Sequence, residues 1–475
     1  MNRSVLPVRY SAAVTTAAAL LVAAACGPST DGTRDAEEIV RVFRGATLVD
    51  GTGAEPMTDA VVVVRGDRIE AVGRAGEIEV PDADVDESLE GLWIIPGLVD
   101  AHVHFGQSGW FDSRPDAMNL QTYHPYDEVI ARLAATPELF SEAYLCSGVT
   151  SVFDVGGYGW SVGLQERGET DPRFVRVSAT GPLLSTIDFW LSTEDDHQFV
   201  FLADSAAVRE GVQANADLGA SAIKIWYIVP PDQDSVRVFD LVRLTAAEAD
   251  ARNLPLVVHA TGMWEAKNAI RAGADVLVHG VFDVEVDEEF LEMALEAGVI
   301  YTPTVTVTEG YRNVFNQVGT AGLPYPAGCA DEGTRNLLDS ELPSEWVPPA
   351  EMITQYEDFV AANRAVGIEN LRRVQAAGVT IALGTDAGNP GTLHGPSVHY
   401  EAVVFQEAGM TPMEVLVSAT RDAARAMGRG ADLGTIEPSK FADFAILRAD
   451  PTANAANLRE IARVVKGGRT VWPPE

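Results

Sequence analysis

Four histidines and one aspartate stand where apolar runs of this sequence end. His102 and His104 are two residues apart at the end of the run 97–105, so on a strand both imidazoles would point to one side. His259, His279 and Asp386 close three later runs. Two histidines at this spacing can simply be satisfied core groups, but a titratable side chain that ends an apolar strand is costly to bury without a partner or a metal. The pattern therefore predicts that these five side chains meet around a metal ion.

Lys224 adds a sixth candidate, because it interrupts the apolar run SAIKIW. An ammonium inside a buried strand must pair with a carboxylate, lose its proton or be modified. A carbamylated lysine would present two oxygens and could bridge two cations, whereas a salt bridge to an internal carboxylate is the structural alternative. The Asp386 carboxylate could bind a metal and take a proton from bound water, or it could cap a helix N-terminus.

Two further residues are candidate substrate contacts. Tyr227 is three residues after Lys224, so it would face the other side of an ideal strand unless the strand has ended. A loop position would let it contact substrate, and packing is the alternative. His394, in GTLHG, follows the last apolar run; it could contact substrate or be an exposed loop histidine.

The middle of the chain alternates compact apolar runs with segments of helical length, such as 244–253 and 287–298. Strands buried on both faces have continuous apolar runs, and eight of them alternating with helices is typical of a (β/α)8 TIM barrel within an α/β fold. A doubly wound open sheet is the alternative. The eight runs are 97–105, 148–156, 173–182, 220–227, 254–261, 274–280, 299–306 and 379–388.

The two ends of the chain differ from this middle. Short alternating segments bounded by Gly and Asp predict antiparallel strands both before and after it. We therefore expect a small β-sandwich formed from 39–95 and 429–475, around a metal-dependent barrel over 96–428. Two long segments, 182–199 and 309–352, are candidate lids, although neither carries a motif that predicts a substrate.

The N-terminus has the pattern of an export signal. Arg3 and Arg9 precede the apolar run Ala12 to Ala25, which is too short for a membrane span. Cys26 follows three alanines as in a bacterial lipobox, although Ala23 stands where such sites usually carry Leu or Val. We expect a signal peptide of the lipoprotein type over 1–26, followed by a linker over 27–38; simple cleavage without lipidation is the alternative. The protein would be periplasmic or at the cell surface, and would meet a membrane only through a lipid anchor at Cys26.

The composition of this 475-residue chain limits the classes of partner that it could bind. The formal charge of −35 disfavours binding to nucleic acid and other polyanions. Only Cys146 and Cys329 follow Cys26, which is too few for a thiolate metal cluster. Cys146 lies in an apolar stretch typical of core packing, and one bridge between the two cysteines remains open. A small-molecule substrate is therefore expected, and no oligomeric state is predicted.

The order and surroundings of these residues resemble the amidohydrolase superfamily, in its binuclear metal-dependent branch. The resemblance covers nearly all of 39–475 and rests on IIPGLVDAHVHF, SAIKIW, VVHATG, VLVHG, ALGTDAGNPGTLHG and LGTIEPSKFADFAIL. The chain looks most like secreted Xaa-Pro dipeptidase-like or imidazolonepropionase-like members. Imidazolonepropionases generally lack a lysine on strand four and hold a single metal, so Lys224 favours the dipeptidase-like side.

The resemblance implies two divalent ions. His102, His104 and Asp386 would hold the more buried ion, and carboxylated Lys224 would bridge to a second ion on His259 and His279. Zinc suits these donors best. Two such ions would lower the pKa of a shared water to about 7, and the hydroxide would attack a carbonyl while Asp386 carried the proton to the leaving group.

Three functions are compatible with such a site. An amide or peptide hydrolase acting on a dipeptide or N-acyl amino acid is the first. A lactone, ester or organophosphate hydrolase on the same scaffold is the second. A surface lipoprotein that binds metal without turnover is the third.

Overall fold

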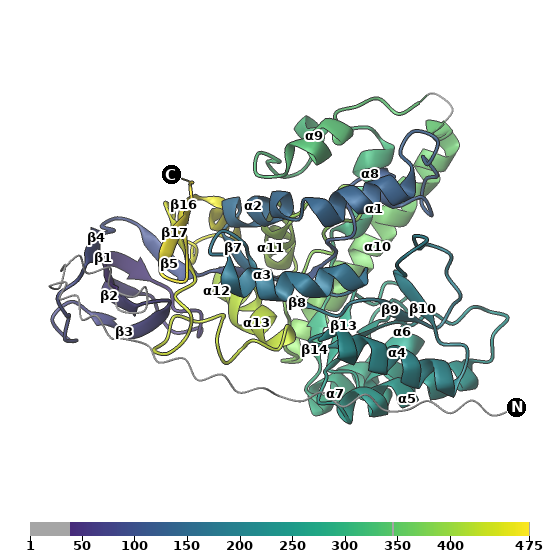
Figure 1. Cartoon of the computed structure of the whole chain (residues 1–475), viewed down its shortest axis with the longest axis horizontal. Helices are drawn as coiled ribbons and strands as arrows, with labels where there is room; N and C mark the ends of the chain where they lie inside the picture. The colour runs from purple at the N-terminus through teal and green to yellow at the C-terminus, as the bar shows by residue number, and fades with distance from the viewer. Residues whose placement is uncertain (1–38, 344–345, 475) are drawn as a thin grey trace, which may run out of the picture. The chain divides into compact units, whose positions relative to one another are not determined.

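The computed structural model describes residues 39–343 and 346–474, which belong to one compact unit (Figure 1). The predicted signal peptide, Cys26 and the 27–38 linker lie outside the described residues. Within the described ranges, no helix is both long and apolar enough to cross a membrane.

The two ends of the chain meet in one sheet of eight strands, with the order β17-β16-β15-β5-β1-β2-β3 and β4 beside β1. Figure 1 shows the early, purple strands and the late, yellow strands together. The pairing of β5 with β15 joins the two ends, as predicted. The expected two-layer sandwich is not confirmed, because the strands form a single sheet. Its strands are β1 Val40–Leu48, β2 Met57–Arg65, β3 Arg68–Arg74, β4 Val85–Ser88, β5 Trp93–Pro96, β15 Phe444–Leu447, β16 Ile461–Lys466 and β17 Arg469–Trp472.

Strand β2 shows why this sheet is buried on both faces. Val62 and Val64 pack with one cluster of apolar side chains, while Val61 and Val63 pack with another. Since successive side chains of a strand point to opposite faces, an unbroken valine run needs apolar cover on each side. The valine run 61–64 therefore stabilises the sheet from both of its faces.

The middle of the chain is α/β with parallel sheets, as predicted. One sheet has the order β6-β7-β8 and the other β10-β9-β11-β12-β13-β14, and every pair in them is parallel. The strands are β6 Leu98–Val103, β7 Val149–Asp154, β8 Arg176–Ala179, β9 Leu183–Ser185, β10 Phe199–Phe201, β11 Ile223–Trp226, β12 Leu256–His259, β13 Val276–Val278 and β14 Ile300–Thr302.

The eighth predicted strand is the main departure. The run 379–388 forms isolated bridges on both sides, from Ile381 to Tyr301 of β14 and from Ala387 to Val103 of β6. Over the described residues, the ladders therefore do not join into one continuous closed barrel. The segment nevertheless lies between the first and seventh predicted strands, which is where an eighth barrel strand would lie.

Helices follow most of the parallel strands. The predicted segment 244–253 overlaps α5 but extends three residues past its end, and 287–298 covers α7 with one residue beyond each end. Asp234 caps α5 by accepting from the backbone N–H groups of Val236 and Arg237, and Asp287 caps α7. The helices are α1 Tyr126–Ala135, α2 Glu138–Cys146, α3 Leu164–Thr170, α4 Ser205–Leu218, α5 Ser235–Asp250, α6 Met263–Ala272, α7 Glu288–Ala297, α8 Val307–Phe315, α9 Glu332–Leu338, α10 Ala350–Ala376, α11 Ser397–Glu407, α12 Pro412–Val417 and α13 Ala423–Ala426.

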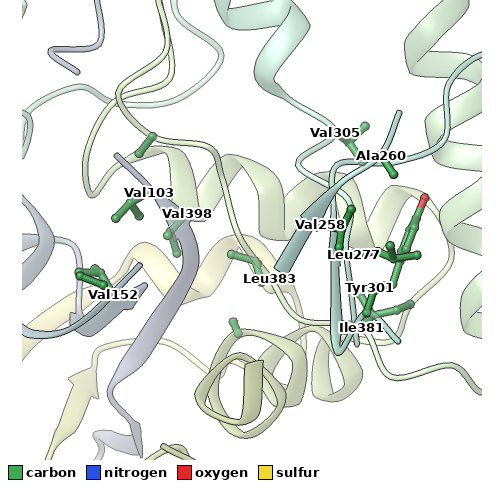
Figure 2. Packing of buried hydrophobic residues seen from close by; sticks show 14 of the residues in the cluster. Val103, Val152, Val258, Ala260, Leu277, Tyr301, Val305, Ile381, Leu383 and Val398 are labelled. Carbon is green, nitrogen blue, oxygen red and sulfur yellow. The ribbon is translucent and has the colours of Figure 1, made fainter. Parts of the chain in front are cut away.

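The strands that carry the candidate site are anchored by a row of paired core residues. Val258, Leu277, Tyr301 and Ile381 occupy successive positions across β12, β13, β14 and the 379–388 segment (Figure 2). They belong to the large cluster that includes the surrounding helices. Their neighbours along the strands form a second cluster, to which seven parts of the barrel region contribute: Val99, Ala101, Phe153, Ala222, Val257, Val276, Ile300 and Ala382.

The long segment 309–352 is more ordered than a bare loop. It contains most of α8 and all of α9, and its side chains pack with Trp110 and Phe111. Cys329 in this segment forms a disulfide with Cys146 at the end of α2. The bridge that the sequence left open therefore exists, and it ties the segment to the helical layer.

Candidate metal centre

Five of the six predicted ligands lie near the C-terminal ends of parallel strands, and Lys224 lies within one. His102 is on β6 and His104 follows it; Lys224 is on β11, and His259 is the last residue of β12. His279 follows β13 directly, and Asp386 follows the bridges of the last segment. Because the C-terminal ends of parallel strands open on the same side of the fold, these side chains reach one region.

Three of the six form a tight, buried group: His102, His104 and Asp386 have ligand atoms within 4.8 Å of one another. Asp386 Oδ1 is 2.9 Å from His104 Nε2 and 3.3 Å from His102 Nε2. The two Nε2 atoms are themselves 3.3 Å apart. The exposed fraction of each residue is 6% or less. Three potential donor atoms therefore share a space that water scarcely reaches.

The hydrogen bond of His104 indicates which of its ring nitrogens faces Asp386 without a proton. Its Nδ1 lies 2.6 Å from the carbonyl oxygen of Gly156, and a carbonyl can only accept, so Nδ1 carries the proton. In the neutral ring, Nε2 then presents a lone pair to Asp386 Oδ1, which is buried and makes no hydrogen bond. Within the described residues, no hydrogen-bond partner fixes the tautomer of His102, because its Nδ1 is buried and unpartnered. With Nε2 of both rings unprotonated, three acceptor atoms converge, and such a set suits a cation. The residues present therefore fit a divalent metal ion.

The other three predicted ligands line the same cavity, whose volume is about 220 Å³. The rings of His259 and His279 have centroids 4.3 Å apart, and His279 and His102 are 4.8 Å apart. In the sheet, Lys224 pairs with Val257 and Trp226 with His259, so Lys224 and His259 face the same side. All six side chains are thus brought together, in two neighbouring groups.

Lys224 is buried, with an exposed fraction of 1%. Its ammonium makes no hydrogen bond or ion pair with the residues that the structure describes. Burial lowers the pKa of Lys224 to about 7, against the opposing influence of Asp386 and Asp154. The salt-bridge alternative for this lysine is therefore not what the structure displays, and a neutral amine is accessible near pH 7.

Burial also favours neutral imidazoles at this site. It lowers the pKa of His279 to about 3 and the pKa values of His102 and His259 well below the ordinary value. Burial acts to raise the pKa of Asp386, but the facing histidines outweigh it, and that pKa lies well below its usual range. Neutral imidazoles and an ionised carboxylate are the forms that bind metal.

Two of the predicted ligands have an unusual backbone conformation. His279 has φ 70° and Asp386 has φ 62°, both in the left-handed region that non-glycine residues rarely adopt. On a regular strand His279 would point away from the side that Val278 faces, and the left-handed turn breaks that alternation. Thr304, which lies 3.0 Å from His279 Nδ1 through its Oγ1, has φ 45°. Such conformations cluster at functional sites, where the surroundings hold them in place.

Several supporting residues were not predicted. Asp100 accepts from the Thr385 hydroxyl at 2.6 Å, the Thr385 N–H at 3.0 Å and the His102 N–H at 3.3 Å, so it joins the strand of His102 to the segment of Asp386. Asn389 donates from Nδ2 to the backbone oxygen of Asp386 at 3.1 Å. Arg114 in turn donates to Asn389. Asp100 and Asn389 sit beside the predicted ligands in sequence, but Arg114 lies in a stretch without legible periodicity.

The two predicted substrate contacts do not lie in this cavity. Both ring nitrogens of His394 are committed, to the Tyr144 hydroxyl and the Gln107 carbonyl at 2.9 Å each, and its ring stacks on Phe140 with centroids 3.8 Å apart. It is a buried core histidine rather than an exposed one, because the loop after the last run folds back onto α2. Tyr227 lines a neighbouring cavity, and its buried hydroxyl has no hydrogen-bond partner in the described chain.

Comparison with known proteins gives three kinds of similarity. The model of the amidohydrolase family matches residues 93–471. An imidazolonepropionase of Rhizorhabdus wittichii is 28% identical over 445 residues, covering 86% of this chain and 92% of that protein. An ochratoxinase of Aspergillus niger is 26% identical, covering 92% of this chain and 88% of that protein. The crystal structure of a Xaa-Pro dipeptidase with bound methionine has the same fold, with a TM-score of 0.69 at 24% identity, covering 91% of this chain and 99% of that chain.

Proposed function

We propose that this chain, which belongs to the amidohydrolase family and is a hydrolase of carbon–nitrogen bonds, cleaves the amide or peptide bond of a small molecule with the help of bound divalent cations. One observation carries the metal requirement. The Nε2 atoms of His102 and His104 and the Oδ1 atom of Asp386 converge in a buried space, with Oδ1 lacking any hydrogen bond. Substrates would be dipeptides or N-acyl amino acids.

The proposal includes two ions, with zinc as the native metal. His102, His104 and Asp386 would hold one, and His259 and His279 the other, with Lys224 between them as a carboxylated, bridging ligand. Support for the modification comes from the burial of Lys224 and its pKa of about 7. A neutral amine can add to carbon dioxide, forming a carbamate and releasing one proton. Imidazole and carboxylate donors suit zinc.

When bound, the cations would supply Lewis acidity, which makes water nucleophilic at neutral pH and polarises a carbonyl group. Asp386 would take the proton of the attacking water and deliver it to the leaving nitrogen, since this residue lines the cavity. Gly156 would hold the tautomer of His104, and Asn389 would hold the backbone of Asp386. The surrounding walls would exclude bulk water.

Hydrolysis assays test this function. Metal-loaded and chelator-treated protein would be compared on N-acyl amino acids, dipeptides and a γ-lactone, together with Asp386→Asn and the surface control Asp217→Asn. We expect metal-dependent cleavage of amides, with a loss of about 100-fold or more in Asp386→Asn and none in the control. Faster turnover of the lactone would favour the ester-hydrolase alternative. Activity that is indifferent to chelators would refute the proposal, and metal binding without any turnover would favour a binding protein.

We also propose that the parallel strands and the 379–388 segment form a closed (β/α)8 barrel, with the terminal sheet as a sandwich domain over 39–95 and 429–475. The inner cluster supports closure, because β6, β7, β12, β13, β14 and the last segment all contribute apolar side chains to it. An experimental structure would test closure through the pairing of 379–388 with β6 and β14, and would test the sandwich by whether the terminal strands form two packed sheets.

Export to the periplasm or cell surface is likewise a proposal. The Cys146–Cys329 disulfide supports it, because disulfides persist in oxidising compartments. Mass spectrometry of protein from a bacterial host would show whether the mature chain begins at Cys26 and carries lipid. A full-length, cytosolic product with free thiols would contradict the proposal.

A further inference from the structure

The cavity beside the metal centre has two unlike walls. One consists of Phe189, Phe199 and Trp226, which we call the aromatic wall. Phe189 lies 4.9 Å from Trp226 and 5.0 Å from Phe199 between ring centroids, and Phe199 lies 5.0 Å from Trp226. Each of the three is only partly buried, and each lines the cavity. Large apolar rings are thus left open to the space next to the metal ligands.

Strand pairing and hydrogen bonds hold the aromatic wall beside β11, the strand of Lys224. Phe189 and Phe199 come from the 182–199 segment, whose strand β9 pairs in parallel with β11. Thr186 donates from its hydroxyl to the backbone oxygen of Ile228 at 2.6 Å and accepts from the Ile228 N–H at 2.9 Å. Trp226 is two residues after Lys224 on the same strand and so shares its face. The 182–199 segment is therefore fixed to β11, the strand that carries Lys224.

The opposite wall is polar. Arg114 donates to both oxygens of Asp116, at 2.9 and 2.7 Å, and also to Asn389, so its charge is already paired. The Tyr311 hydroxyl donates to Asn389 at 2.8 Å. Through Asn389 this wall is continuous with Asp386, whereas the aromatic wall is continuous with His259, whose ring centroid is 5.9 Å from that of Trp226.

This polarity orients an amide substrate. If Asp386 delivers the proton to the leaving nitrogen, the amine part of the substrate lies toward the polar wall. The acyl group then lies toward the aromatic wall. No charged side chain of the 182–199 segment lines the cavity there. Exposed aromatic faces in a cavity are best covered by another planar ring, because offset and edge-on aromatic contacts add to the burial of area. An apolar cavity of about 150 Å³ accommodates benzene, so the volume of about 220 Å³ admits a ring together with the amide group.

We propose that the aromatic wall selects amides whose acyl group carries a planar aromatic ring. Phe189, Phe199 and Trp226 are then specificity-determining residues that contact the acyl group and take no part in proton transfer. The inference rests on the proposed amide hydrolysis, and it assigns a function to the 182–199 segment.

The test compares three probes that share one leaving group: N-benzoylglycine, N-cyclohexanecarbonylglycine and N-acetylglycine. Wild type is expected to prefer the benzoyl over the cyclohexyl compound in kcat/KM. Trp226→Leu and Phe189→Leu are expected to reduce that preference about 3- to 10-fold, mainly through KM. Trp190→Leu is the matched control, because Trp190 is in the same segment but is 58% exposed and does not line the cavity. This variant should prefer the benzoyl compound as strongly as wild type does.

A second measurement needs no turnover. Isothermal titration of benzoate and cyclohexanecarboxylate into the same metal-loaded proteins should show the same preference in Kd and the same loss in the two variants. Equal affinity for both acids in wild type, or equal ratios in wild type and both variants, would overturn the inference. Failure to hydrolyse any of the amides would refute the proposed function alone, since the titration still tests the aromatic wall.

Discussion

Asp100 is the residue whose removal tests most sharply how the metal centre is held together. Its carboxylate is fully buried and accepts from two backbone N–H groups, of His102 and Thr385, and from the Thr385 hydroxyl. Asp100→Ala would leave both N–H groups buried without an acceptor. Each such group costs about 1–3 kcal/mol, so we expect the variant to lose about 3–5 kcal/mol of unfolding free energy.

A conservative variant separates hydrogen bonding from charge. Burial raises the pKa of Asp100 to about 7, so a neutral side chain is tolerated at this position near neutral pH. Asp100→Asn keeps an acceptor for the two N–H groups and should lose only about 1 kcal/mol. Urea unfolding of the metal-free proteins measures both values. Asp217→Ala, at an exposed position, should stay within about 0.5 kcal/mol of wild type.

The same variants probe the site itself. Because Asp100 joins the strand of His102 to the segment of Asp386, Asp100→Ala should also bind less metal per chain, while Asp100→Asn should stay close to wild type. If Asp100→Ala unfolds with less than about 1 kcal/mol of loss, or if Ala and Asn behave alike, the bridging role assigned to Asp100 is wrong.

The remaining predictions concern the disulfide and a core histidine. Replacing Cys146 and Cys329 together by Ser should lower the unfolding free energy by up to about 5 kcal/mol, since the bridge closes a loop with a sequence separation of 183; a reductant should destabilise wild type and not the double variant, and equal sensitivity would argue against the bridge. Burial lowers the pKa of His394 to about 4, against about 6.5 in an unfolded chain, so between these values the unfolded state binds the extra proton and stability falls as the pH drops, by about 3 kcal/mol in all. His394→Gln should reduce the slope of unfolding free energy against pH between 6.5 and 5, and an unchanged slope would mean that His394 does not contribute.

Much of the fold was predictable from the pattern of apolar runs. Continuous runs such as LPLVVHAT became parallel strands, and both ends of the chain joined one sheet as their alternation indicated. The eighth run was harder, because pairing depends on how closely the segment can approach its neighbours. A Cβ atom at Gly384 would lie 2.9 Å from the His102 backbone nitrogen and Cβ, a contact that no periodicity reveals.

The candidate site was likewise only partly predictable from the sequence. The six candidate ligands were identifiable because a titratable residue at the end of an apolar run, or inside one as at Lys224, is itself the signal. Tyr227 and His394 were placed less well, since the path of the chain beyond a strand is set by tertiary contacts such as the stacking of His394 on Phe140. Arg114, Phe189 and Phe199 lie in segments without periodicity, whereas Trp226 lies on a predicted strand. The Cys146–Cys329 pairing could not be derived from two cysteines so far apart in sequence.

The metal content of purified protein, with and without Lys224→Ala, tests the central claim most directly. Two groups of ligands joined by a modified lysine predict about two divalent ions per chain in wild type and one or fewer in the variant. Lys267→Ala, which removes a mostly buried lysine of α6 paired with Asp287 and Glu289, should leave the content at the wild-type value. Metal content that is low in wild type and unchanged in Lys224→Ala would contradict the account.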